Sequence, residues 1–147
     1  MTRINIISPS ELTDQHLIAE YREITMVPGS LQRTLRSKGG LDKRKIKKTF
    51  TLNAGHVYFF YDKGKYLANR YEELIDEMKA RGFKPNPDRK FPSHVFIDGL
   101  YNDWMPSFNE QMLIRERIAE RIAAKPNWYK HTKICYITQN QRTFYLQ

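Results

Sequence analysis

The chain has 147 residues, of which 40% are hydrophobic and 13% aromatic, so it is long enough to form one globular domain with a buried core. Its 25 Lys and Arg outnumber 16 Asp and Glu, and the formal net charge of +9 is typical of nucleic-acid binders but is shared by ribosomal, architectural and membrane-surface proteins. The single Cys135 excludes an intrachain disulfide and a multi-cysteine zinc site, and no apolar run is long enough for a signal peptide or a membrane span. We therefore expect a cytoplasmic protein with no membrane partner.

The amino-terminal residues offer a reactive group. A chain that begins with Met-Thr usually loses its methionine because the second residue is small, which would leave Thr2 as the amino terminus. A free α-amine has a pKa of about 7.7–8.0, so an appreciable fraction is neutral and nucleophilic at physiological pH. The neighbouring cation Arg3 would lower that pKa further.

The first predicted helix begins near Pro9. Residues 8–11, Ser-Pro-Ser-Glu, have the pattern of a capping box, with Ser8 at the N-cap and Glu11 reaching back from the third helical position. At about 100° per residue, one face of this helix forms a buried stripe. The stripe comprises Leu17, Ile18, Tyr21 and Ile24. The other face carries Leu12, Gln15, His16, Ala19, Arg22, Glu23 and Met26, and its charges, taken alone, are those of an ordinary solvated surface.

Two further helices are predicted between the first helix and Gly82. Residues 27–29, Val-Pro-Gly, should interrupt the first helix because proline removes a backbone donor, and a second helix should occupy roughly residues 30–40. Asp62 is a candidate cap for a longer helix that runs to about residue 81, where Gly82 supplies the stop. Apolar residues recur along this helix at the spacing of one buried stripe.

Two aromatic segments flank that longer helix. The segment 49–63 is aromatic and most simply core, and His56 within it is more typical of a hydrogen-bonded structural histidine than of a ligand. Residues 83–106 contain four prolines and predict a long irregular connection on the surface. We expect its aromatic side chains to pin it to the core. They are Phe91, Phe96, Tyr101 and Trp104.

Two groups of cations are candidates for binding phosphates. Residues 43–48 place five cations in six positions, as either a solubilising loop or a phosphate clamp, and we favour the clamp because packed like charges repel unless an anion neutralises them. These cations are Lys43, Arg44, Lys45, Lys47 and Lys48. A second capping box, at residues 107–110, opens a helix that should end before Pro126. One edge of this helix carries Arg117, Arg121 and Lys125, which could line a DNA backbone groove or pair with Glu116 and Glu120.

The last part of the chain mixes aromatic and basic residues. Trp128, Tyr129 and Lys130 have the composition suited to stacking on unstacked bases, although such a mix is as often a segment packed against a helix. Residues 134–147 form two short apolar runs, either a hairpin or a docked tail. The elements together predict an all-α fold. It is a single compact domain, residues 1–147, of about three main helices with long irregular connections and a C-terminal extension, residues 139–147, of unknown role.

Several blocks of the sequence resemble a known family. They are Met1-Thr2-Arg3-Ile4-Asn5, Asp14-Gln15-His16-Leu17, Ala19-Glu20-Tyr21-Arg22-Glu23, Gly55-His56-Val57, Phe59-Phe60-Tyr61-Asp62-Lys63, Arg81-Gly82-Phe83 and Trp128-Tyr129-Lys130. In this order and spacing they closely resemble the phage-type pyrimidine dimer DNA glycosylases, also called phage endonuclease V. The resemblance runs from Thr2 to about Tyr136, with divergent segments at residues 30–48 and 84–104.

The resemblance implies a bifunctional DNA glycosylase and abasic-site lyase that needs no cofactor and no metal. Its implied partner is double-stranded DNA with pyrimidine dimers or abasic sites, and we expect a monomer. In the implied reaction, the amine of Thr2 attacks the sugar and forms an imine, while Glu23 stabilises positive charge and moves protons. Arg3, Arg22, Gln15 and His16 would contact phosphates and sugar, and Arg117, Arg121 and residues 128–130 would contact the DNA. Met26 stands where the family has a third arginine.

Two other readings are open from the sequence. A non-catalytic, damage-sensing DNA-binding protein would use the same basic faces but would not depend on a free amino terminus. A metal-dependent nuclease built on His16, His56 or His94 is disfavoured, because these residues are scattered along the chain without the spacing of a ligand set.

Overall fold

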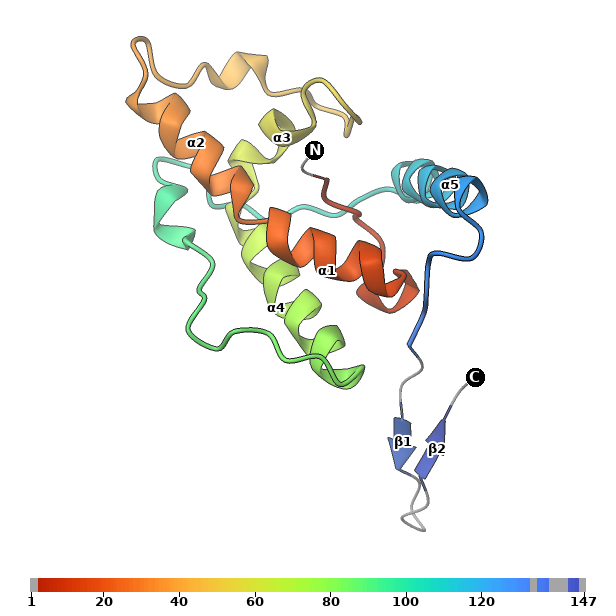
Figure 1. Ribbon diagram of the computed structural model, residues 1–147. Helices are drawn as coiled ribbons and strands as arrows, with labels where there is room; N and C mark the ends of the chain where they lie inside the picture. Colours follow the sequence, from red (N-terminus) through yellow and green to blue (C-terminus); the bar gives the residue numbers. More distant parts are fainter. Residues whose placement is uncertain (1–2, 133–134, 138–142, 146–147) are drawn as a thin grey trace.

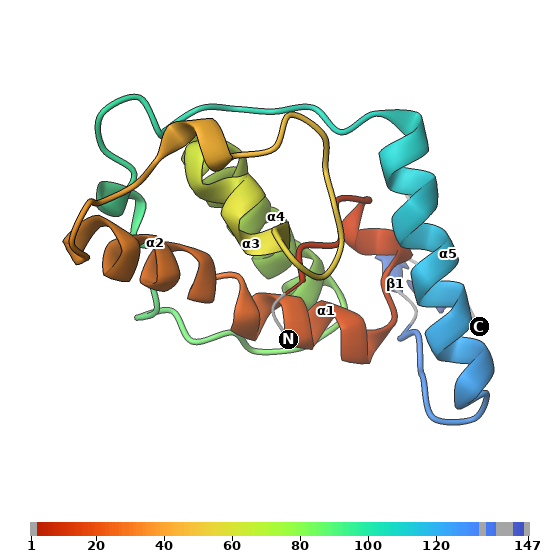
Figure 2. The ribbon, with the colours of Figure 1, turned by 90° about the horizontal axis from the view of Figure 1, so that it is seen from above.

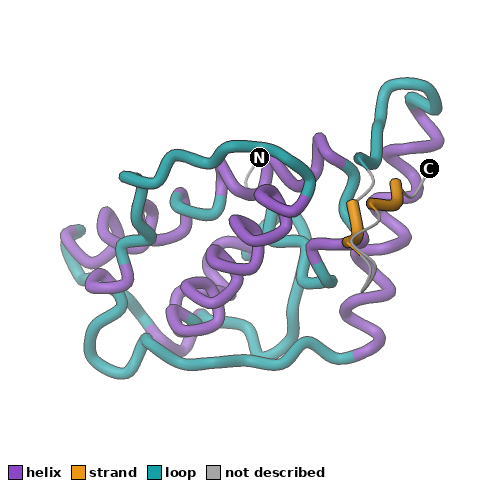
Figure 3. Tube along the Cα trace, turned by 90° about the horizontal axis from the view of Figure 1, so that it is seen from below, coloured by secondary structure: helices purple, strands orange, loops and turns teal. Residues whose placement is uncertain are grey.

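A computed structural model describes residues 3–132, 135–137 and 143–145 (Figure 1). The described part contains the helices α1 (Asp14–Glu23), α2 (Met26–Arg36), α3 (His56–Phe59), α4 (Gly64–Ala80) and α5 (Phe108–Ala124). The described part also contains four short 3-10 helices. η1 (Pro9–Glu11) precedes α1, and η2 (Lys43–Lys45), η3 (Phe60–Asp62) and η4 (Ser93–Val95) lie between the α-helices. The predicted all-α fold is confirmed. Long irregular connections join the helices, as the tube of Figure 3 shows.

The first helix begins later than the sequence predicted. Ser8 caps only η1, and α1 begins at Asp14 after the N-cap Thr13, whose side chain accepts a hydrogen bond from the His16 amide at 3.1 Å. Glu11 does not reach back to close a capping box, because its carboxylate accepts two hydrogen bonds from Arg115 on α5, each 2.9 Å long. Between η1 and α1 the chain is extended at Leu12, whose side chain is fully buried.

The break that separates α1 from α2 lies at Ile24 and Thr25, three residues before the proline. Pro28 sits inside the first turn of α2, where a backbone N–H would have no helical partner, so the ring is tolerated. The prediction that residues 27–29 interrupt the helix was therefore wrong in position. Four described helices have ten or more residues, where about three main helices were expected.

The ends of α4 and α5 follow from local chemistry. Asp62 does not cap α4, because its carboxylate accepts a hydrogen bond from Lys63 at 2.7 Å. At the other end Gly82 adopts φ +89°, and the Phe83 and Gly82 amides donate to Met78 and Lys79 carbonyls, which is the Schellman stop predicted from the glycine. The predicted capping box of Ser107 and Glu110 is present at the start of α5, and α5 ends before Pro126.

The core gathers apolar side chains from every helix and from the amino-terminal segment. Residues Ile4, Ile6 and Ile7 are buried, and the segment that carries them runs between α1 and α5 (Figure 2). α1 packs along α4, and only Ile114 and Ile118 of α5 are buried.

The connection between α4 and α5 is irregular apart from η4, as predicted. Three of its aromatic side chains, Phe91, Phe96 and Trp104, pack on the core. The expectation for Tyr101 was wrong: its side chain is 46% exposed, because the chain here turns its neighbour Leu100 inward.

The C-terminal runs pair with one another. β1 (Cys135–Ile137) and β2 (Thr143–Tyr145) form an antiparallel ribbon in which Cys135 faces Tyr145 and Ile137 faces Thr143. Of the two alternatives from the sequence, the hairpin pairing is present, and its connecting residues 138–142 lie outside the described part. No helix in the described residues is long and apolar enough to cross a membrane.

Candidate active site

The amino-terminal segment is held by side chains from four helices, α1, α3, α4 and α5. The Ile4 amide donates to His56 Nε2 at 2.9 Å, and His56 Nδ1 in turn lies 2.8 Å from the Thr51 carbonyl. Because Nε2 accepts, the proton of the neutral ring is on Nδ1, and burial lowers the pKa of His56. The prediction of a structural, hydrogen-bonded His56 is confirmed. On the opposite side, Gln111 of α5 donates to the Ile6 carbonyl at 3.1 Å.

A buried ion pair fixes the middle of this segment to α1 and α4. Glu20 accepts hydrogen bonds from Arg70 at 2.6 and 2.9 Å and from the Asn5 amide at 2.9 Å. The Arg70 guanidinium also donates to the carbonyls of Asn5 and Ile7. Both side chains are at least 97% buried, and such a pair is stable only when its remaining hydrogen-bonding groups are satisfied, as they are here.

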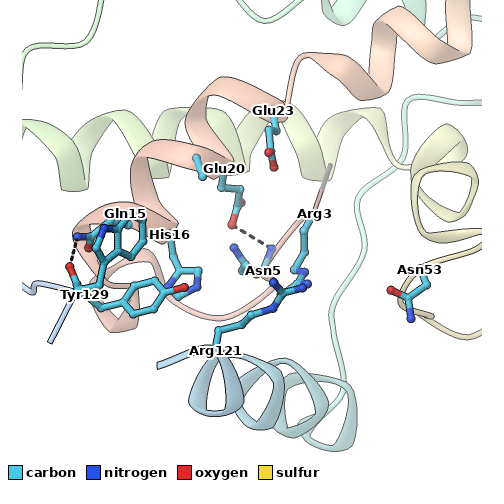
Figure 4. Close-up of a pocket in the computed structure, with 11 residues that line it drawn as sticks. Arg3, Asn5, Gln15, His16, Glu20, Glu23, Asn53, Arg121 and Tyr129 are labelled. Atoms are coloured by element: carbon cyan, nitrogen blue, oxygen red, sulfur yellow. Dashed lines mark hydrogen bonds between the residues drawn. The ribbon is translucent and has the colours of Figure 1, made fainter. Parts of the chain in front are cut away.

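A pocket of about 340 Å³ lies beside this segment (Figure 4). Its wall is formed by α1, the amino-terminal segment, α5 and the residues after α5. It is lined by Arg3, Asn5, Gln15, His16, Ala19, Glu20, Glu23, Asn53, Arg121, Trp128 and Tyr129. The helical period explains the contribution of α1, because residues 16, 19, 20 and 23 lie on one face of it.

The electrostatics of the pocket favour an anion. Arg3 and Arg121 extend toward one another in Figure 4, and Arg117 lies on the same edge of α5. Burial, followed by the charges of Arg121 and Arg117, lowers the pKa of Arg3, while the carboxylate of Glu23 opposes this shift. Guanidiniums that crowd in this way create a positive potential, which a phosphate group would neutralise.

The aromatic wall of the pocket consists of stacked rings. His16 and Tyr129 stack with ring centroids 4.8 Å apart and planes 2° from parallel, and Trp128 meets Tyr129 edge to face at 4.9 Å. Burial, then the charges of Arg3 and Arg121, lowers the pKa of His16, so this imidazole is neutral at physiological pH. A neutral ring in this position adds no further repulsion to the guanidiniums.

The structure brings together only some of the side chains that the sequence marked as candidates. Seven of them line the pocket: Arg3, Gln15, His16, Glu23, Arg121, Trp128 and Tyr129. Gln15 lines it with a carboxamide already engaged, since it donates to the Trp128 carbonyl at 2.7 Å and accepts from the Lys130 amide at 3.0 Å. Thr2, the predicted nucleophile, lies outside the described residues.

The other candidate cations do not line the pocket. Arg22, one position before Glu23, lines a separate pocket with Lys84 and Arg89. Arg117 pairs with Glu120 at 3.6 Å, and Lys125 lies over the Trp128 ring at 5.3 Å. The cations of residues 43–48 are all exposed. The Lys43 ammonium donates to the backbone carbonyl of Asp98, and the Arg44 guanidinium donates to the carboxylate of Asp42. Lys130 is exposed beside the aromatic wall.

Three residues of the site were not singled out from the sequence. Glu20 lies on the same helix face as His16 and Glu23, so the helical period alone could have predicted its place in the site. Asn5 and Asn53 reach the pocket only through the tertiary fold, and the Asn5 Oδ1 atom is buried with no hydrogen-bond partner among the described residues. Asn53 adopts φ +61°, a conformation that asparagine tolerates better than most residues. Among the described residues, no three His, Cys, Asp or Glu side chains are grouped as metal ligands.

The fold and the site define a class of protein. The helical body carries an arginine-rich pocket with exposed stacking rings, and one carboxylate of this pocket lies outside the buried ion pair. These are features that bind a nucleic-acid backbone and its bases. The family model of the pyrimidine dimer DNA glycosylases matches residues 1–91, and the chain belongs to this family. Membership implies glycosylase activity on damaged DNA. The matched range contains α1 to α4 and the Arg3, His16 and Glu23 wall of the pocket, whereas α5 and the aromatic residues after it lie beyond it.

Proposed function

We propose that this protein is a bifunctional DNA repair enzyme, which cleaves the glycosidic bond of the 5′ base of a cyclobutane pyrimidine dimer and then cuts the strand at the resulting site. The observation that carries the proposal is that Arg3, the sequence neighbour of Thr2, lines the same pocket as Glu23. An amine next to Arg3 and the Glu23 carboxylate are the two groups that the chemistry requires. The pocket also supplies cations for the phosphates on either side of a lesion.

In the first step the neutral amine of Thr2 attacks C1′ of the sugar, and the bond from C1′ to the base nitrogen breaks. The base leaves with the electron pair of that bond and takes up a proton. Positive charge develops on the sugar in the transition state, and the Glu23 carboxylate would stabilise it. The amine then loses a proton, the sugar ring opens at O4′, and a protonated imine remains between the protein and C1′.

In the second step the imine acts as an electron sink. It acidifies the C2′ proton, which a base removes, and the 3′ phosphate leaves with the electron pair of its C–O bond, so that the strand is cut by β-elimination. Water then hydrolyses the imine and regenerates the amine. Glu23 is the candidate proton carrier for both removals. The chemistry itself uses only the amine and the carboxylate of this chain.

The surrounding cations would position the DNA. Arg3 and Arg121 face the pocket and would hold phosphates next to the lesion, with Arg22, Arg117, Lys125 and Lys130 around it. The exposed cations of residues 43–48 would hold a phosphate further away, and thereby offset the loss of the arginine that Met26 replaces. Trp128 and Tyr129 would stack on bases that leave the helix.

Borohydride trapping tests this proposal. The protein is incubated with a duplex that contains one thymine dimer in the presence of borohydride, which reduces the imine to a stable amine. We expect a covalent protein–DNA adduct that peptide mapping assigns to Thr2. A form with one extra residue before Thr2 is the matched control and should bind the duplex without forming the adduct. Absence of any adduct with both dimer and abasic duplexes would favour a non-catalytic damage-binding protein and overturn the proposal.

A further inference from the structure

The segment 128–132 lies on the surface without apolar anchors. None of its residues belongs to the hydrophobic core, and Trp128 is 53% exposed. Burial in the hydrophobic core therefore does not hold this segment in place. Its position depends on hydrogen bonds to η1 and to the first turn of α1.

Asp14, the first residue of α1, makes the largest number of these bonds. Its Oδ1 accepts from the Thr132 amide at 3.0 Å, its Oδ2 accepts from the Thr132 hydroxyl at 2.5 Å, and its own amide donates to the Lys130 carbonyl at 2.7 Å. The carboxylate is in turn held by Arg81 at 2.9 Å, a guanidinium with no exposed surface. Burial alone would raise the pKa of Asp14, but the bonds from Thr132 and Arg81 hold it below its usual range.

Two neighbours add to the attachment. Gln15 bonds the backbone of Trp128 and Lys130 through both ends of its carboxamide. His131 Nε2 lies 2.9 Å from the Ser10 carbonyl, so it donates to that oxygen. The segment is thus attached at residues 128, 130, 131 and 132, and between these points Tyr129 is directed onto His16 at the wall of the pocket.

We propose that Asp14 is a positioning residue for damaged DNA. Its carboxylate is held by Arg81 and bonded to Thr132, and it thereby fixes the positions of the Tyr129–His16 stack and of the exposed Trp128 ring, on which displaced bases would stack. This inference rests on the proposed function of the pocket and adds to it a residue that touches neither the sugar nor the phosphates. The rigid placement of an aromatic platform lowers the entropy lost when a base binds.

The test uses two variants that remove different contacts of Asp14. Asp14→Asn removes the carboxylate from both Arg81 and Thr132, whereas Thr132→Val removes only the hydroxyl bond and leaves the Arg81–Asp14 pair intact. Asp88→Asn, which neutralises an exposed carboxylate on the connection after α4, is the matched control. The first readout is the proton NMR spectrum of the free protein, in which the ring of His16 is shifted by the current of the stacked Tyr129 ring. A His16→Asn variant assigns the resonance.

We expect both variants to lose the ring-current shift of His16, and to raise KM for the dimer duplex by roughly tenfold for Asp14→Asn and by less for Thr132→Val. The single-turnover rate at saturating protein should stay within about twofold. The Asp88→Asn control should match the unaltered protein in the His16 shift, in KM and in the single-turnover rate. An unchanged His16 resonance in both variants, or a loss of rate without a change in KM, would overturn the positioning role. Because the NMR readout needs no catalysis, it distinguishes failure of this inference from failure of the proposed activity.

Discussion

Two carboxylates one turn apart on α1 have different surroundings and, we infer, different tasks. Glu20 is 99% buried and satisfied by Arg70 and the Asn5 amide. Glu23 is partly exposed in the pocket and has no ion pair within 4.0 Å in the described part of the chain. The first holds the fold around the site, and the second is available to a substrate.

Glu23→Gln should retain DNA binding and lose nearly all cleavage of the glycosidic bond. The amide keeps the shape of the side chain but cannot stabilise positive charge or accept a proton, a loss of about 10²–10⁴-fold for groups of this kind. Single-turnover formation of alkali-labile sites in a dimer duplex measures the rate of glycosidic-bond cleavage, and gel shift measures the binding. Glu116→Gln, an exposed change on α5, should leave both values as they were. Glycosidic-bond cleavage at the normal rate in Glu23→Gln would remove this residue from the chemistry.

Glu20→Gln should instead destabilise the protein. Loss of the charge leaves Arg70 buried and unpaired, which costs about 3–5 kcal/mol in the free energy of unfolding. Urea unfolding measures the difference, and Glu23→Gln is the matched control, with a change within about 0.5 kcal/mol. Equal stabilities of the two variants would show that the Glu20–Arg70 pair is not the anchor of the amino-terminal segment.

At the scale of elements, the amino-terminal segment depends on neighbouring helices for its position. His56, the first residue of α3, can accept from the Ile4 amide only while Nε2 is unprotonated. Gly64, the first residue of α4, is needed because a Cβ there would lie 2.4 Å from the Phe96 ring. The first residues of α3 and α4 thus each determine a contact between distant segments.

The state of His56 predicts how stability depends on pH. Its pKa in the folded protein lies below 6.5, so below about pH 6.5 the unfolded chain binds more protons than the folded one and the free energy of unfolding falls. His16, whose pKa is also lowered, acts in the same direction. Urea midpoints at pH 7.5 and 5.5 should differ by less in His56→Asn than in the unaltered protein. His94→Asn changes an exposed ring and should leave that difference intact.

Gly64→Ala and Gly29→Ala should have opposite effects although both glycines are helical. The methyl group at position 64 collides with Phe96, and forcing a group into a packed core costs about 1–3 kcal/mol. At position 29 the nearest atom is the far end of Arg33 at 3.8 Å, so the substitution should be neutral or stabilising by about 0.4–1 kcal/mol. Thermal unfolding of the two variants tests this, and a stable Gly64→Ala would contradict the described contact.

Local signals predicted the ends of helices well only where no distant partner competes. The box at Ser107 and the stop at Gly82 need nothing beyond the chain around them, and both are present. Ser8 and Thr13 are both suitable caps, and the choice between them depends on Arg115, which lies more than 100 residues away and binds Glu11. In the site, the helical period placed His16 and Glu23 on one face, whereas Asn5, Asn53 and Arg70 join them only through tertiary packing.

On the scale of the whole molecule, positive charge gathers around the pocket from segments far apart in the sequence. The charges of Arg121 and Arg117 contribute to the lowered pKa of Arg3, and residues 43–48 add exposed cations outside the pocket lining. Carboxylates of α4, namely Glu73, Asp76 and Glu77, line a different pocket with η1. The asymmetry would orient the protein on a polyanion before any specific contact forms.

Binding to duplex DNA should therefore weaken steeply with salt. Each neutralised phosphate contributes about −0.9 to the slope of log K against log salt concentration. The double variant Lys47→Gln with Lys48→Gln should reduce the magnitude of this slope by up to about two. Lys65→Gln with Lys79→Gln, the same charge change on α4, should leave the slope unaltered. Equal slopes for the two double variants would exclude residues 47 and 48 from the DNA interface.

Both ends of α1 are tied to α4 by buried arginines, Arg81 at Asp14 and Arg70 at Glu20. α5, by contrast, places only Ile114 and Ile118 in the core. The two walls of the pocket therefore differ in stiffness. A ligand that is too wide for the pocket should therefore displace α5 before α1, while the carboxylate of Glu23 and residues 128–132, which are hydrogen-bonded to η1 and α1, keep their places.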